Sequence, residues 1–546
     1  MAFGILEDHY LENVPGTALL TDLSVSRGKQ VVINEARKLK MGSGQYSHIV
    51  LVPQPSDDPN DPLNWPRWKK ELCFWTLAFA ASLDGALSPM VAPGYVLLSQ
   101  QFALSVDDVA SAFGSILLGL GCFMLAQNAL AAKFGQRIVY LASVFLMFIS
   151  CIWCALSPSI SSIRASRVFQ GFGMSALQSL VASTLEQIYF VHERGSRNVI
   201  WHFSILSGIT LGPLLYSYVI QNLSWQMGFW FVSIPLGLAV ILVFFFVPET
   251  TFIRETNNGL SEGHRSSDSK GIDNCVNDEE KSSSSSNHVS PSRASYPQQL
   301  KIWHGTFTNV NLFKLFLRPF PFLLSPVFWF VFLAYGMQTA WLSLLPICSS
   351  TIFTIEYNFT ASQIGLTNLG GLVGIVLATL ISGPLTDWGT VWLAKYNKGI
   401  YEPEFRIWFV STMVLGVFGY AGWAVGTTHN MPWIGAVACM AMANFSMVMS
   451  GSASITYLLD THGPHALHVL AVVNFTKNMV LYGFTFFVNG MVESRGVKTS
   501  LLILAGCQAF CWLASIPMYV FGKRARSFIA RHPRLFTVGD DGVPSH

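Results

Sequence analysis

The chain has 546 residues, of which 51% are hydrophobic and only 12% are charged. Soluble proteins carry about 25% charged residues, so this deficit excludes an ordinary soluble domain and indicates that much of the chain lies in lipid. The formal net charge of +3 is small, and the basic residues are not gathered into one face, which excludes a nucleic-acid-binding surface.

In chain order, polar and apolar blocks alternate in a regular way. Residues 1–70 are polar and end in "NWPRWKKE", which predicts a cytoplasmic tail with aromatic and basic anchors at the membrane interface. Residues 71–250 hold six apolar runs, each long enough to cross a bilayer, and residues 325–522 hold six more. Between them, residues 251–324 include a Ser-rich segment that predicts a disordered cytoplasmic linker, and residues 523–546 form a basic cytoplasmic tail. The predicted fold is therefore all-α, with twelve transmembrane helices in two similar six-helix bundles.

The basic residues between the apolar runs fall mostly on one side of the predicted membrane. With the N-terminus inside, the cytoplasmic connections include Lys133, Arg137, Arg194, Arg197, Lys395 and Arg406. The opposite connections hold chiefly Arg164, Arg495 and Lys498. Because cytoplasmic loops are enriched in Lys and Arg, we expect both termini and the linker in the cytoplasm.

Three ionisable residues lie at membrane depth, where a charge is costly and usually marks a pathway or a structural pair. Asp84 is followed by Gly85 and Pro89, helix breakers that suit a bending helix at a cavity. It is interpreted as a proton acceptor or a counter-charge for a cationic substrate, or alternatively as a static ion-pair partner of Arg167. Lys477 is open to three interpretations: it faces an anionic substrate, it repels cations, or it extends toward the interface.

Neutral polar residues near these charges complete the predicted substrate and proton pathway. The pathway set is Asp84, Arg167, Gln178, Gln338, Asn474, Lys477 and Asn478, with Tyr335, Trp341 and Asn444 as further cavity candidates. An aromatic residue on a membrane helix is more often a packing residue, so the aromatic candidates have a structural alternative.

Several motifs occur in register along the chain. "NALAAKFGQR", Asn128 to Arg137, closes the second apolar run, and "SGPLTDWG" stands at the matching point of the second half. "RVFQGFG" begins at Arg167, and "GITLGPLLY" contains Gly208, Gly212 and Pro213. These motifs resemble the major facilitator superfamily, in particular its fungal drug:proton antiporter-like members with twelve helices. "PLNWPRWKK", "LAAKFGQR" and "YEPEFR" look closest to the polyamine and histidinol transporter branch.

The resemblance implies that charges in the loop after the second helix latch the two bundles in the outward-facing state. In this sequence Ala132 replaces the family's carboxylate, so we expect Glu186 to pair with Arg137 or Lys133 instead. The alternative is that Lys133 and Arg137 only set topology. The expected gating set is Lys133, Gly135, Arg137, Glu186, Arg194, Gly383 and Asp387.

For Arg167 the resemblance implies a role in proton coupling. For Gly208, Gly212 and Pro213 it implies an antiporter motif in the fifth helix, while close helix packing alone is the alternative.

Two further patterns, a histidine triplet and a glycosylation sequon, do not change the predicted function. His462, His465 and His468 are spaced for a metal site, but Gly463 and Pro464 break the helix there, so no metal is expected. Asn358 in "NFT" is a glycosylation sequon in a short outer loop.

These features predict a secondary transporter that works by alternating access, not an enzyme, and no cofactor is expected. The first hypothesis is proton-coupled efflux of a small organic molecule, such as a toxin or secondary metabolite, by a monomer in the plasma membrane. The alternative is a proton-coupled importer of polyamine-like cations, and a transceptor is a weaker third. The expected partners are the substrate, protons and the lipid bilayer, but not nucleic acid.

Overall fold

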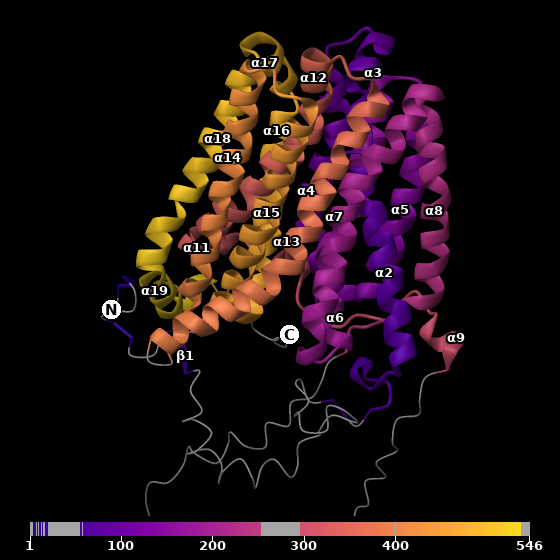
Figure 1. The fold of residues 1–546 in the computed structure, drawn as a ribbon. Coiled ribbons are helices and arrows are strands. Elements are labelled where there is room, and N and C mark those ends of the chain that lie inside the picture. The colour runs from indigo at the N-terminus through magenta and orange to yellow at the C-terminus, as the bar shows by residue number, and fades with distance from the viewer. Residues whose placement is uncertain are drawn as a thin grey trace, which may run out of the picture.

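Two helical bundles stand side by side in the computed structural model (Figure 1). The structure describes residues 4–6, 8, 10–11, 14, 17–19, 55–56, 58–252, 295–397 and 400–536. We call residues 67–246 the N-bundle and residues 326–531 the C-bundle.

The N-bundle begins after the short 3-10 turn η2 (Pro62–Asn64). Its helices are α2 (Arg67–Leu87), the turn η3 (Ala92–Gly94), α3 (Tyr95–Phe102), α4 (Val106–Phe134), α5 (Gln136–Ala155), α6 (Ile160–Ile188), α7 (Val191–Asn222) and α8 (Trp225–Phe246). Serine N-caps start α4, α6 and α8, where the hydroxyls of Ser105, Ser159 and Ser224 accept hydrogen bonds from the first helical turn.

The C-bundle contains one helix that changes its winding. Its elements are α11 (Pro326–Val331), the π-helical segment η5 (Phe332–Met337), α12 (Gln338–Tyr357), α13 (Ala361–Tyr396), η6 (Pro403–Thr412), α14 (Met413–Thr428), α15 (Trp433–His462), η7 (Gly463–His465), α16 (Ala466–Phe484), α17 (Val488–Arg495), α18 (Val497–Leu513), α19 (Ser515–Arg531) and the short α20 (Pro533–Phe536). α11, η5 and α12 run on without a break, so η5 is a π-helical turn inside one membrane helix, a feature often found at functional sites.

Within the described residues, ten helical segments are long and apolar enough to cross a membrane. The pair α16 and α17, bent by 45°, makes an eleventh. α6 has 29 residues and packs against α4 and α5, but Arg164, Arg167 and Glu186 reduce its hydropathy. With α6 the described chain has the predicted twelve-helix, all-α architecture, and the predicted fold class is confirmed.

The end of the linker departs from the predicted disorder, and the last membrane helix extends into the predicted C-terminal tail. Residues 253–294 lie outside the described part of the chain, but 295–324 form α9 (Tyr296–Gln299), α10 (Leu312–Leu317) and η4 (Phe320–Leu324). Likewise, α19 continues helical to Arg531, past the expected start of the C-terminal tail at residue 523. Both segments are ordered because their polar groups find partners on the bundles, as described below.

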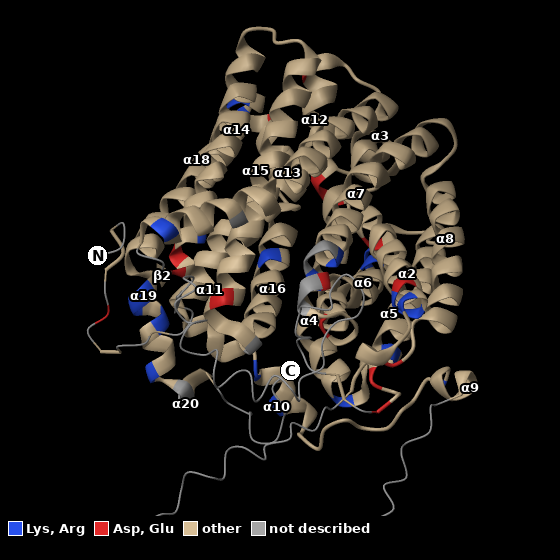
Figure 2. Cartoon of the chain, turned by 60° about the horizontal axis from the view of Figure 1, so that its bottom comes forward, with Lys and Arg blue, Asp and Glu red and all other residues tan. Residues whose placement is uncertain are grey.

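The two ends of the molecule differ in charge. Figure 2 shows that most Lys and Arg positions along the ribbon lie toward the end that carries α9, α10 and α19. We call this the basic end, and we call the opposite end, with α3 and α17, the far end.

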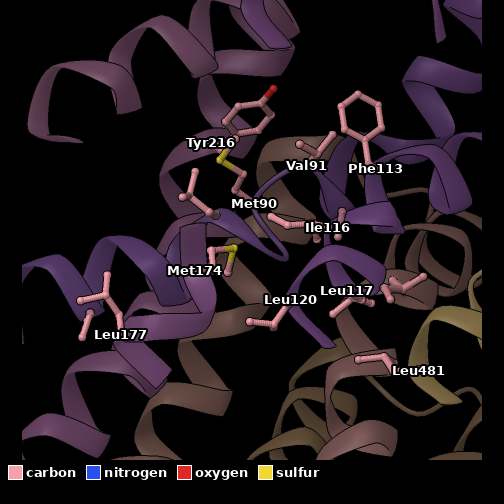
Figure 3. Close-up of a cluster of buried hydrophobic side chains, with 14 of the residues drawn as sticks. Met90, Val91, Phe113, Ile116, Leu117, Leu120, Met174, Leu177, Tyr216 and Leu481 are labelled. Atoms are coloured by element: carbon pink, nitrogen blue, oxygen red, sulfur yellow. The ribbon is translucent and has the colours of Figure 1, made fainter. Parts of the chain in front are cut away.

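The buried apolar side chains form two main clusters. The larger cluster joins N-bundle residues to residues of the C-bundle such as Leu344, Phe353 and Leu481. Figure 3 shows its middle, where Leu481 of α16 lies beside Leu117 of α4. The second cluster belongs almost entirely to the basic half of the C-bundle and contains Phe328, Tyr457 and Val472. The bundles therefore share one core toward the far end and have separate packing toward the basic end.

Candidate functional site: a cavity between the bundles

A cavity of about 840 Å³ lies between the two bundles and is lined by both. Toward the far end its lining stops at the level of Tyr95 and Ile347. Toward the basic end it reaches Glu186, Arg318 and His465. Since the shared core seals the far half, the cavity is accessible from the basic end. Its volume is typical of a site for a drug-sized organic molecule.

Asp84 lies on the cavity wall near the end of α2 and is fully buried. The side-chain amide of Gln178 donates to Asp84 Oδ2 at 3.0 Å, whereas Oδ1 has no hydrogen-bond partner among the described residues. A buried carboxylate oxygen without a donor is costly, and protonation or a bound cation would remove that cost. The site therefore supplies a group that can exchange a proton for a positively charged partner.

Arg167 is also fully buried, but it does not pair with Asp84, so the alternative of a static Asp84–Arg167 ion pair is wrong for this structure. Its guanidinium donates to the carbonyls of Leu87 and Ser88, at 2.9 and 3.2 Å, and to Gln170 Oε1 at 2.6 Å. α2 ends at Leu87 because Pro89 and Pro93 cannot continue the helix hydrogen bonds. Arg167 thus satisfies carbonyls that the broken helix leaves without partners, and it does not line the cavity.

Lys477 of α16 lines the same cavity from the C-bundle and is 8% exposed. Its Nζ lies 5.9 Å from the centroid of the Tyr335 ring, and Tyr335 belongs to the π-helical segment η5. Asn474 and Asn478 line the wall on the same helix, and the Asn478 Nδ2 has no hydrogen-bond partner among the described residues. Sequence reasoning correctly grouped Lys477 with these two amides.

One predicted pathway residue, Gln338, and two of the further cavity candidates lie elsewhere. The Gln338 amide contacts the hydroxyls of Ser446 and Ser450 inside the C-bundle. Asn444 donates to the carbonyl of Met440 at 2.9 Å, and Trp341 packs edge-on against Phe484 at 5.0 Å between ring centroids. None of the three lines the cavity, because polar side chains on buried helices also pair within one bundle.

The glycines of the fifth-helix motif bring α7 against α2. A Cβ at Gly208 would collide with the carbonyl oxygen of Ser82, and one at Gly212 would lie 2.7 Å from the carbonyl oxygen of Ala86. Gly85 of α2 meets the carbonyl of Ile205 in the same way. These contacts explain the glycines by close packing of the helix that carries Asp84, while Pro213 lies inside α7.

The loop between α4 and α5 is organised by Glu249, which sequence reasoning missed. Gly135 has φ of +95°, a left-handed conformation that favours glycine. Glu249 Oε1 accepts from the backbone N–H of Gln136 at 3.0 Å, and Oε2 accepts from that of Arg137 at 3.2 Å. The Glu249 carboxylate therefore caps the start of α5, the position at which an acid complements a helix N-terminus. Its signal in the sequence is the acid in "VPET", directly after an apolar run.

Arg137 does not bind Glu186 among the described contacts, and the predicted pairing, which the resemblance places in the outward-facing state, stays a prediction. Its guanidinium donates to the carbonyls of Phe244 and Val247 at the end of α8 and of Leu300 and Lys301 in the linker. These bonds order the linker against the N-bundle. The Phe307 N–H adds a bond to the carbonyl of Lys133 at 2.9 Å.

The other expected gating residues do not all have described side chains, so their gating role stays a prediction. Glu186 lines the cavity mouth, and its backbone carbonyl accepts from Arg194 at 2.6 Å. A Cβ at Gly383 would meet nothing within 4 Å. The side chain of Asp387 lies outside the described part of the structure.

A carboxylate joins the bundles at the far end instead. Asp107 at the start of α4 accepts from the backbone N–H groups of Asn489 and Gly490, each at 2.8 Å. These two residues form the first turn of α17 in the C-bundle, so Asp107 caps a helix of the other half. A second bond between the bundles joins α13 to α7, where the Ser362 N–H donates to Gln221 Oε1 at 2.7 Å.

A charged cluster holds the basic end of the C-bundle together. Arg526 of α19 binds Glu402 at 2.8 Å and Glu404 at 2.7 Å, and Lys523 binds Glu402 at 2.8 Å. Arg526 is 2% exposed. Because its ion pairs with Glu402 and Glu404 hold this part of the chain against the bundle, α19 continues past residue 523. The acids belong to the "YEPEFR" motif, whose Arg406 pairs with Asp460 at 2.6 Å.

The N-terminal segment docks on this cluster and not on the N-bundle. β1 (Ala18–Leu19) pairs antiparallel with β2 (Ile400–Tyr401), and Thr17 donates to Glu402 at 2.8 Å. The Ser527 hydroxyl donates to Asp8 at 2.6 Å, and Ile5 is buried against C-bundle residues. The first described residues of the chain are therefore part of the second bundle.

The remaining motifs are structural. His462 packs against Phe322 with 5.9 Å between ring centroids, and no group of three metal-binding side chains occurs among the described residues. Asn358 is exposed between α12 and α13 in the left-handed conformation, at the far end.

Comparisons with known proteins agree with this architecture. A family model described as Major Facilitator Superfamily matches residues 74–478. The chain is 26% identical to Protein HOL1 of Saccharomyces cerevisiae, over 95% of this chain and 96% of that protein. It is 22% identical to the MFS antiporter QDR3 of Candida albicans, over 96% and 85% of the two chains. It is 24% identical to the efflux pump vrtL of Penicillium aethiopicum, over 86% and 89%.

The fold is also similar to that of a D-xylose-proton symporter of known structure, with a TM-score of 0.58 at 15% identity. The similarity covers 84% of this chain and 99% of that one. At this identity the likeness bears on the fold alone.

Proposed function

The chain belongs to the Major Facilitator Superfamily and is a multi-pass membrane transporter, and we propose that it is a proton-coupled exporter of a small organic molecule. It works by alternating access as a monomer in the plasma membrane. The basic end faces the cytoplasm, in accordance with the excess of Lys and Arg there, so the cavity is in its inward-open state.

The observation that carries this proposal is the Asp84 carboxylate at the closed end of the cavity. One of its oxygens has no partner among the residues that the structure describes, and the group is fully buried. A proton and a cationic substrate group would compete for this oxygen, so one leaves when the other binds. Such competition couples substrate movement in one direction to proton movement in the other.

Export is supported by the relatives whose printed names are efflux pump and antiporter. The alternative, import of polyamine-like cations, is favoured by Asp84 as a counter-charge. Lys477 opposes it, because its ammonium lines the same cavity and repels a polycation. We therefore keep export as the first proposal.

The test compares yeast cells that express the wild type, Asp84→Asn or the matched control Asp108→Asn, with and without a protonophore. Asp108 lies at the far end, where its contact is the hydroxyl of Ser105. Organic metabolites are profiled in cells and medium, and labelled spermidine is followed in parallel. We expect at least one metabolite to move from cell to medium in the wild type and in Asp108→Asn, and this export to stop in Asp84→Asn or with the protonophore.

Two results would contradict the proposal. Export that continues in Asp84→Asn and with the protonophore would remove Asp84 from the coupling. Spermidine accumulation that needs both Asp84 and the gradient, without export of any metabolite, would establish the import alternative instead.

A further inference from the structure

The charges inside the cavity are one acid and one base, and they come from different bundles. Four Asp, Glu, Lys or Arg residues line the cavity: Asp84, Glu186, Arg318 and Lys477. Glu186 and Arg318 lie at the mouth toward the basic end. Asp84 on α2 and Lys477 on α16 are left as the interior pair.

Neither interior charge is neutralised by a described residue. Asp84 receives one hydrogen bond, from Gln178, and its Oδ1 has no partner in the described part of the chain. Lys477 faces the Tyr335 ring at 5.9 Å and has no acid partner among the described residues. A buried charge without a counter-charge is costly, so each is a strong anchor for an opposite charge on a ligand.

We propose that the cavity recognises amphoteric molecules, which carry an amine and an acid on one apolar body. The amine would bind Asp84, and the acid would bind Lys477 with help from the Asn478 amide, whose Nδ2 also lacks a partner. This inference rests on the proposed transport function and narrows its substrate class. A ligand with a single positive charge would neutralise Asp84 but leave Lys477 without a counter-charge. A polycation would also be repelled by Lys477.

The remaining cavity wall indicates that the ligand has an apolar body, and the cavity volume limits the size of that body. Its wall includes Leu117, Leu120, Ile205, Ile347 and Met447. The volume of about 840 Å³ is near the upper part of the range of small-molecule pockets and accommodates more than a single amino acid. An amino-acid-derived molecule of about dipeptide size, with apolar side chains, fits these features.

The test uses four probes with one common body: the dipeptide Phe-Trp, its C-terminal amide, its N-acetyl form, and the form blocked at both ends. They carry both charges, the amine only, the acid only, or no charge. Binding to the purified full-length protein is measured without a gradient by ligand-induced thermal stabilisation, with spermidine as a fifth probe. Because no proton flux or direction enters this measurement, its outcome is separate from that of the export experiment.

We expect the wild type to bind the free dipeptide about tenfold or more tighter than either singly charged form, since each lost contact is a charge-assisted hydrogen bond. In Lys477→Gln, probes with and without the free acid should bind equally well, while a free amine should still increase affinity. In Asp84→Asn, the free acid should still increase affinity and the free amine should not. The matched controls Lys498→Gln, at an exposed far-end lysine, and Asp108→Asn should leave both preferences unchanged.

The proposal is overturned if the amine-only probe or spermidine binds the wild type as tightly as the free dipeptide. It is also overturned if none of the four dipeptide forms stabilises the protein. The wild-type comparison alone decides both points, so it does not depend on whether the variants fold. Either failure would leave proton-coupled export of another substrate class intact.

Discussion

The two ends of this transporter are held by different kinds of contact. At the far end, bonds cross between the bundles: Asp107 caps α17, and Gln221 accepts from Ser362. At the basic end, ion pairs between described side chains lie within one half: Glu71 with Arg197 in the N-bundle, and Arg526 with its two acids in the C-bundle. A dense set of charges therefore need not close that end, whereas the two contacts described at the far end join the bundles directly.

The largest effect is expected from breaking the charged cluster within the C-bundle. Arg526→Ala leaves Glu402 and Glu404 buried without their main partner, which should cost about 3–5 kcal/mol of folding free energy. Thermal unfolding in detergent measures this loss. Lys523→Ala is the matched control, because its side chain is 21% exposed and its removal leaves Glu402 with the buried Arg526 as partner, so the loss should be clearly smaller. Equal losses in both variants would refute the structural role of Arg526.

The next effect tests the crossing contact at the far end. Asp107→Ala removes two charge-assisted hydrogen bonds between the bundles, which should favour the outward-open state by about 1.5–3 kcal/mol. Spin labels at the exposed positions Leu104 and Arg495, in a background without native cysteines, would report a longer distance. Asp108→Ala should leave that distance unchanged. If Asp107→Ala also leaves it unchanged, Asp107 is not the far-end latch.

A smaller shift is expected from a glycine in the same region. A Cβ at Gly365 of α13 would collide with the Ser217 hydroxyl of α7 and lie 3.2 Å from the carbonyl oxygen of Pro213. Gly365→Ala should therefore separate these helices at a cost of about 1–2 kcal/mol, detected with the same spin labels. Gly383→Ala is the control on the same helix, since a Cβ there meets nothing within 4 Å. If the spin-label distance changes by the same amount in both variants, the change comes from α13 itself and not from the contact between Gly365 and α7.

The smallest effect concerns pH at the basic end. Burial alone raises the pKa of Glu402, but hydrogen bonds from Lys523, Arg526 and Thr17 outweigh it and hold the pKa below its ordinary value. The ionised form therefore stabilises the fold above the unfolded pKa of about 4.3, and this stabilisation is lost as pH falls through the lower folded value. The melting temperature of the wild type should fall more than that of Glu402→Gln below about pH 4.3. Parallel decreases would show that Glu402 does not contribute.

The sequence predicted the helices and the polar cavity wall well, because both leave local signals. Long apolar runs predict spans, and an isolated Asp or Lys inside such a run predicts a special environment; Asp84 and Lys477 indeed line one cavity. Gln338 was misplaced because a polar residue on a membrane helix pairs equally well within its own bundle.

The partners of charged loop residues could not be predicted in the same way. Arg137 binds backbone carbonyls that lie more than 100 residues away in sequence, and a carbonyl leaves no trace in the residue type. Glu249 and Asp107 cap helices that begin elsewhere in the chain, so their roles depend on tertiary placement. For Arg167 the sequence left an ion pair with Asp84 open as an alternative, but its guanidinium binds the carbonyls of a broken helix instead.

The N-terminal segment precedes the N-bundle in the sequence but packs on the C-bundle. Since β1 and Ile5 belong to the C-bundle, a cut in the central linker would leave the first fragment carrying a strand of the second. From Leu19 the chain runs 36 residues to Pro55, enough to reach about 120 Å when extended, so rocking of the bundles need not pull the strand away. If the two halves were expressed separately, the N-terminal strand of the first half would still connect it to the C-bundle. A protein fused before Ile5 would therefore move with the C-bundle, although the N-bundle follows it in the sequence.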